Sequence, residues 1–142
     1  MRGDRFRVPV ETTYVAELGL AAYAFARLEW SAVWCCERME AGCIERIAER
    51  TAGKIAGHFK RLAEANGDAA IIAASQRFDE LVQRRNDLLH AKPGTDSDGA
   101  QRLFRNAVAW TEEEIATVAD DFTECSDTLN SFLFGVLRSN AD

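Results

Sequence analysis

The chain has 142 residues, which is enough for one domain with a sizeable core, and its 47 % apolar and 28 % charged residues are typical of a globular protein. No uninterrupted apolar run is long enough to cross a bilayer, so we expect no membrane partner. The net charge of −6 opposes general affinity for nucleic acid. Residues 1–7 are charged and precede no clean apolar signal region, which favours a cytoplasmic protein over a secreted one.

The first predicted helix begins near Thr12 or Thr13, where a hydroxyl can cap free backbone amides. Its apolar residues recur alternately three and four positions apart over about seven turns, which predicts one buried stripe. Trp30 and Trp34 lie off this stripe and widen the apolar surface, so the helix needs a second neighbour, either another helix or a second subunit. The stripe consists of Tyr14, Leu18, Ala21, Phe25, Leu28, Ala32, Cys35 and Met39.

A second helical region is predicted over residues 44–66, after a break at Ala41-Gly42, with a kink or split near Thr51. Asn66-Gly67-Asp68 is typical of a helix end followed directly by a new N-cap. The third helix should run from Asp68 to Leu89 or His90, because Pro93-Gly94 forbids its continuation. The inward residues of the second region are Ile44, Ile47, Ala48, Ile55, Phe59 and Leu62.

Residues 92–106 form the one predicted loop of real length, and 101–104 with 107–110 could form a short β-hairpin. Thr111 and Glu114 match a capping box, which predicts the start of a last helix. Together these patterns predict one all-α domain over residues 1–142, a four- to five-helix up-and-down bundle whose first and last helices pack antiparallel. The apolar stripe of the last helix is Ile115, Val118, Phe122, Cys125, Leu129, Phe132 and Val136.

The four cysteines lack the spacing of a metal site, and neither histidine is near a cysteine in sequence. We therefore interpret them as buried reduced thiols and expect no metal and no cofactor. His58 is interpreted as a core or rim histidine, and the three tryptophans as core residues and not base-stacking platforms. The cysteines are Cys35, Cys36, Cys43 and Cys125.

The third helix places a cation within its own apolar stripe. Ile71, Ala74, Phe78, Leu81, Arg85 and Leu88 are spaced three or four apart, and Arg85 takes a position that packing would give to an aliphatic residue. A charge there must be paired or must face a wet cleft, since burying it alone costs several kcal/mol. Asn86 and His90 lie one turn apart on a neighbouring face.

The segment Arg85-Asn86-x-x-x-His90 resembles the motif of the HEPN superfamily of helical domains. The resemblance covers residues 76–142, with the motif at the end of a long helix, then a loop and a final amphipathic helix. It implies a homodimer in which two motifs meet, and many members are metal-independent endoribonucleases of toxin or defence systems. An antitoxin or neighbouring regulatory protein is an implied partner.

In that interpretation Arg85 would contact the scissile phosphate, His90 would exchange a proton, and Asn86 would orient either one. An acidic chain needs a local basic patch to hold RNA, for which the candidates are Arg84, Lys92 and Arg102. Two alternatives remain. The domain could be a non-catalytic dimeric binding or regulatory module, with Arg85 paired to a carboxylate of the last helix and His90 capping its own helix, or it could be an unrelated helical bundle.

Overall fold

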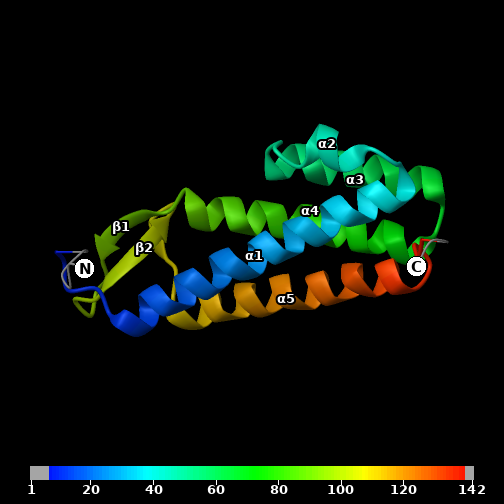
Figure 1. Ribbon diagram of the computed structural model, residues 1–142. Helices are drawn as coiled ribbons and strands as arrows, with labels where there is room; N and C mark the ends of the chain where they lie inside the picture. The colour runs from blue at the N-terminus through cyan, green and yellow to red at the C-terminus, as the bar shows by residue number, and fades with distance from the viewer. Residues whose placement is uncertain (1–6, 140–142) are drawn as a thin grey trace.

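The computed structural model describes residues 7–139. The charged N-terminal segment 1–7, which favours a cytoplasmic protein, lies outside the described residues except for Arg7. Within these residues the chain forms five helices, and a small antiparallel sheet lies between the fourth and fifth helices in the sequence (Figure 1). The prediction of a mainly helical fold is confirmed. The elements are α1 (Thr12–Met39), α2 (Cys43–Ile47), α3 (Ala52–Asn66), α4 (Ala69–Leu89), β1 (Lys92–Thr95), β2 (Gln101–Arg105), β3 (Val108–Ala109) and α5 (Glu112–Phe134).

Helix boundaries follow local chemistry at most ends. The predicted split at Thr51 is confirmed, because its side chain accepts a hydrogen bond from the Lys54 amide and starts α3. Gly67, with φ +84°, ends α3, and Asp68 then caps α4. The capping box of Thr111 and Glu114 is present at α5. The predicted hydroxyl cap of α1 is wrong, since its N-cap is Glu11 and makes no side-chain cap bond.

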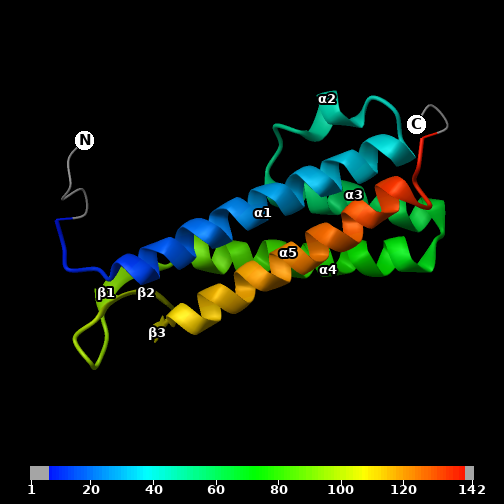
Figure 2. The same ribbon diagram turned by 60° about the horizontal axis from the view of Figure 1, so that its bottom comes forward.

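The expected antiparallel packing of α1 and α5 is wrong, because the two helices run in the same direction (Figures 1 and 2). Hydrogen bonds join residues about 95 positions apart all along the pair, from Tyr14–Trp110 through Ser31–Ser126 to Cys35–Leu129. The reason is the segment after α1, which returns along the bundle through α2. As a result α3 runs in the same direction as α1, α4 runs in the opposite direction, and α5 runs in the direction of α1 again.

The long predicted loop is largely a sheet. The hairpin of β2 and β3 is confirmed in outline, but β1 pairs with β2 in an antiparallel register from Lys92↔Phe104 to Thr95↔Gln101, and the sequence pattern missed it. Pro93 is tolerated because β1 is an edge strand. Gly94 lets the strand pass Phe104, since a Cβ there would lie 3.0 Å from that ring.

The predicted stripes of α1 and α5 face one shared cluster of buried apolar residues. Two details differ. Trp30 is 50 % exposed and so is not a core residue, and Val136 is 58 % exposed while Leu137 is buried in its place. The second difference arises because α5 ends at Phe134, after which the helical spacing no longer holds. No helix among residues 7–139 combines the length and apolarity that a membrane span requires.

Helix α3 and the sheet cover different parts of the bundle and leave a groove between α1 and α4 open. α3 packs beside the first half of α4, where Phe59 contacts Phe78 and Lys60 pairs with Asp79. The sheet covers the opposite end of the bundle (Figure 2). Between the two, the groove joining the first half of α1 to the last turns of α4 stays open, and Arg85 lies there.

Candidate functional site

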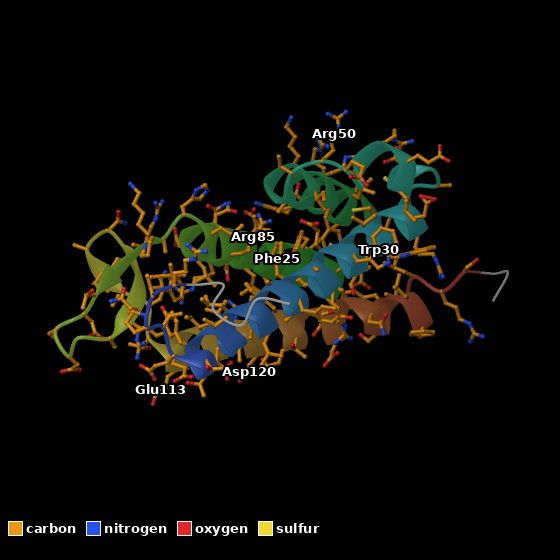
Figure 3. All side chains as sticks on the ribbon, turned by 60° about the vertical axis from the view of Figure 1, so that its left-hand side comes forward. Phe25, Trp30, Arg50, Arg85, Glu113 and Asp120 are labelled. Carbon is orange, nitrogen blue, oxygen red and sulfur yellow. The ribbon has the colours of Figure 1, made fainter. Side chains whose placement is uncertain are left out.

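Arg85 lies on the wall of an open cavity between α1 and α4. Its guanidinium lies over the Phe25 ring of α1, with Cζ 4.8 Å from the ring centroid. Figure 3 shows the two residues next to each other. The side chain is half-buried, and the cavity measures about 400 Å³. Of the two outcomes predicted for this cation, an ion pair or an open cleft, the structure shows the cleft. The cavity is lined by Leu18, Ala21, Ala22, Phe25, Ala26, Glu29, Arg85, Leu88, Leu89, Ala91, Leu103 and Phe122.

The polar neighbours of Arg85 are few. Its Nη1 donates a hydrogen bond to Asn86 Oδ1 at 3.2 Å. No carboxylate oxygen of residues 7–139 lies within 4.0 Å of its guanidinium nitrogens, so Arg85 forms no ion pair with the described chain. Glu29 interacts with it at longer range, and burial raises the pKa of that carboxyl although the Arg85 charge opposes the rise. The alternative prediction, that Arg85 pairs with a carboxylate of the last helix, is wrong for the described residues. Asp121 of that helix pairs with Arg77.

His90 is the C-cap of α4, and its backbone amide bonds to the Asn86 carbonyl at 2.9 Å. The imidazole is exposed and makes no hydrogen bond to the described residues, so the alternative of a capping side chain is not seen. Leu89, 60 % exposed, lines the cavity, whereas His90 does not. The structure thus brings Arg85 and Asn86 together and leaves His90 at the helix end, facing solvent.

The three predicted RNA-binding residues lie in three different environments. Arg84 stacks over Trp110 at 4.8 Å and lines a separate recess, and Lys92 is exposed on β1. Arg102 is held inside its own chain, with Nη2 3.0 Å from Glu11 and Nε 3.9 Å from Asp96. Because its charge is already neutralised by two carboxylates, Arg102 is poorly placed to capture phosphate.

The cavity combines one cation with a mainly apolar wall. A guanidinium can hold a phosphate or carboxylate by two parallel hydrogen bonds, while apolar side chains favour a nucleobase or an apolar side chain of a partner. One N–H group of Arg85 donates to Asn86, and this hydrogen bond orients the guanidinium. The other N–H groups of the guanidinium can bind a ligand.

The structure assembles one polar cluster that the sequence pattern missed. Cys43 Sγ lies 3.2 Å from His58 Nε2 and 3.6 Å from Glu40 Oε2, and His58 Nε2 lies 3.4 Å from the same oxygen. Burial and the hydrogen bond to Glu40 raise the pKa of the Cys43 thiol. The only signal in the sequence was the Glu-x-x-Cys spacing, because the packing of α2 and α3 against α1 brings in the histidine fifteen positions later.

The remaining thiols are buried and free, as predicted. Burial raises the pKa of Cys35 to about 12 and that of Cys125 to about 11, and it raises the pKa of Cys36 further. A thiolate is the reactive form, so these three cysteines are structural.

No family model, curated protein or solved structure matches this chain. The assignment of a function consequently depends on the site itself.

Proposed function

We propose that this protein is a HEPN-type, metal-independent endoribonuclease that acts as a homodimer in the cytoplasm. The observation that carries the proposal is Arg85, a half-buried guanidinium on the wall of an open cavity with no carboxylate of the described chain at ion-pair distance. Such a cation is stabilised when an anion enters, and in RNA that anion is the phosphodiester.

The chemistry assigns one role to each motif residue. Arg85 binds a non-bridging phosphate oxygen and stabilises the charge that develops there as the adjacent ribose 2′-oxygen attacks phosphorus. His90 exchanges a proton with that 2′-hydroxyl or with the leaving 5′-oxygen. Asn86 orients the guanidinium through its 3.2 Å hydrogen bond. The attack breaks the bond to the 5′-oxygen and gives a 2′,3′-cyclic phosphate and a free 5′-hydroxyl.

A second subunit completes the site in this proposal. One histidine cannot be both acid and base at one moment, whereas two copies supply both roles. Leu89 is 60 % exposed at the rim of the cavity, between Arg85 and His90 in sequence. An exposed leucine in this position favours a two-fold contact that brings two copies of the motif together.

The test is cleavage of structured RNA by purified protein in excess EDTA, beside the variants Arg85→Ala and His90→Ala. We expect each to lower the rate by about 10²–10⁴-fold, the range for loss of one charge-stabilising or proton-transfer group. Arg27→Ala, which removes an exposed arginine of α1, is the matched control and should cleave normally. Cleavage that survives both motif changes, with products free of cyclic phosphate, would remove the assignment.

The dimer is tested by light scattering after gel filtration. Leu89→Glu should give monomers that do not cleave RNA, because it places a charge at the proposed contact. Leu20→Glu changes an equally exposed leucine of α1 that does not line the cavity, so it should leave both properties intact. A Leu89→Glu monomer with full activity would contradict a composite site.

A second candidate function is supported by the lining of the cavity. Most of its wall is aliphatic or aromatic, with Glu29 and Arg85 as the charged groups. That combination also suits a non-catalytic dimeric module that receives an apolar residue of a regulatory partner such as an antitoxin. This candidate predicts no cleavage by the wild-type protein, and loss of partner binding when Ala22, on the cavity wall, is changed to Trp.

A further inference from the structure

Three side chains with metal-binding atoms meet where α1, α2 and α3 come together. Glu40 follows the last residue of α1, Cys43 begins α2, and His58 lies in the middle of α3. Their donor atoms are separated by 3.2 Å (Cys43 Sγ to His58 Nε2), 3.4 Å (His58 Nε2 to Glu40 Oε2) and 3.6 Å (Cys43 Sγ to Glu40 Oε2). Among residues 7–139 this is the one group of three or more such side chains close enough to share an ion.

These separations match one face of a tetrahedral zinc site. With ordinary Zn–S, Zn–N and Zn–O bond lengths, the donor atoms of such a site lie about 3.3–3.6 Å apart. One thiol, one imidazole and one carboxylate also form a mixed set that suits Zn²⁺ and not Mg²⁺ or Ca²⁺, which prefer oxygen alone. Spacing and chemistry therefore point to the same class of ion.

The backbone around the cluster is ordered before any ion arrives. Glu37 accepts hydrogen bonds from the amides of Gly42 (3.1 Å) and Ile44 (3.4 Å), which fixes the turn between α1 and α2. Gly42 has φ +89°, a conformation that glycine adopts without strain. Cys43 is fully buried, while the side chains of His58 and Glu40 are 20 % and 47 % exposed. The thiol thus lies at the base of the cluster and the carboxylate at its rim, open to solvent.

Two arginines adjoin the cluster and act differently on it. Arg46 Nη2 lies 3.2 Å from Glu40 Oε1, so it holds the second carboxylate oxygen and leaves Oε2 facing Cys43 and His58. Arg61 Nη2 lies 2.7 Å from His58 Nδ1. A guanidinium can only donate hydrogen bonds, so in this contact Nδ1 is the acceptor and the ring proton is on Nε2. Nε2 is the atom that faces Cys43 Sγ and Glu40 Oε2. An ion on Nε2 therefore requires that proton to move to Nδ1 and the exposed Arg61 to turn away.

We infer that Glu40, Cys43 and His58 form a zinc site with a fourth position open to water. Zinc displaces the thiol proton of Cys43 to solvent and links the end of α1 to α2 and α3 through side chains. Both arginines oppose this binding: Arg61 holds the ring proton of His58 on Nε2, and Arg46 Nη2 donates to Cys43 Sγ at 3.5 Å, a bond that the ion must displace. The inference does not rest on the proposed ribonuclease activity, because the ligands belong to α2, α3 and the end of α1 and none of them lines the Arg85 cavity.

The test is calorimetric titration of EDTA-treated, dialysed full-length protein with ZnCl₂, together with thermal melts followed by circular dichroism. We expect one Zn²⁺ per chain, a rise in melting temperature, and a Kd at least tenfold weaker in Cys43→Ser and in His58→Asn. Cys125→Ser, which removes another buried cysteine, should bind as the wild type does. Excess Mg²⁺ should not displace the ion. Absence of stoichiometric binding, or unchanged affinity in His58→Asn, would overturn the inference.

A second set of variants keeps the test valid if Cys43→Ser does not fold. Glu40→Gln changes a half-exposed side chain and should also weaken zinc binding. Arg61→Gln removes the competing charge and should tighten it several-fold, whereas Arg50→Gln should not, because Arg50 points outward from the fold (Figure 3) and its hydrogen bond within the described chain goes to the Arg46 carbonyl and not to a ligand. Equal affinities for the Arg61 and Arg50 variants would contradict His58 Nε2 as a ligand.

A cobalt titration reads the ligand set directly. Co²⁺ in a site with one thiolate should give a sulfur-to-metal charge-transfer band and the visible bands of a tetrahedral ion. Both should vanish in Cys43→Ser and persist in Cys125→Ser. If instead the bands disappear in the Cys125 variant, the ion lies elsewhere.

Discussion

At the level of single residues, the pKa of Glu29 shows the effect of the cavity on a buried charge. Burial raises the pKa of its carboxyl, and the longer-range attraction of Arg85 only partly opposes the rise. A carboxyl whose pKa is higher in the folded state destabilises the fold once it ionises. The chain should therefore lose stability as the pH rises from the ordinary glutamate pKa through the raised one.

The variant Glu29→Gln tests this sign. It keeps the shape and removes the charge, so its melting temperature should exceed that of the wild type at pH 7, and the difference should shrink toward zero near pH 4. Glu49→Gln removes an exposed carboxylate and should not reproduce the trend. A Glu29→Gln protein that is less stable at pH 7 would mean that attraction to Arg85 outweighs burial.

At the scale of elements, the N-terminus of α5 depends on its capping box. Thr111 Oγ1 accepts from the Glu114 amide at 3.1 Å, and the Glu114 carboxylate accepts from the Thr111 amide at 3.3 Å. Because Thr111→Ala removes one of these bonds, we expect it to cost about 1 kcal/mol of unfolding free energy in urea denaturation. Thr117→Ala, an exposed site inside the same helix, should change stability by less, and an equal loss at both sites would argue against the cap.

At the scale of the whole molecule, Tyr14 joins the helical bundle to the sheet. Its hydroxyl donates to the Trp110 carbonyl at 2.9 Å and accepts from the Leu103 amide at 3.0 Å, and the side chain is 1 % exposed. Tyr14→Phe leaves two backbone groups without this partner, so we expect a loss of about 1–3 kcal/mol in urea denaturation. Tyr23→Phe, at a 71 % exposed position, should be neutral, and equal values for the two variants would contradict a role for the Tyr14 hydroxyl.

The elements themselves were largely predictable, because their signals are local. The stripe of α1, the split at Thr51 and the caps of α3, α4 and α5 each depend on residues within a few positions of one another. Strand β1 was missed because Pro93 and Gly94 disfavour a strand in isolation. Only pairing with β2, which lies several residues later, makes the segment extended.

The candidate sites divide in the same way. That Arg85 had to face a cleft or a partner followed from its position within an apolar stripe, a property of the helix alone. Which carboxylate its charge acts on was decided by packing, since the charge of Arg85 acts on Glu29 of α1 from beyond ion-pair distance. The meeting of Cys43 with His58 likewise depends on α2 and α3 both packing against α1, which no spacing between them encodes.

The amino-acid order by itself determined the helices, the caps of α3, α4 and α5, the apolar stripes and the position of Arg85 within the stripe of α4, because each depends on forces that act within a turn or two of backbone. Tertiary packing alone decided that α1 and α5 run in parallel, that the groove between the first half of α1 and the end of α4 stays open, and that Glu40, Cys43 and His58 converge. Those outcomes depend on contacts between residues distant along the chain, and such contacts exist only once the chain has folded.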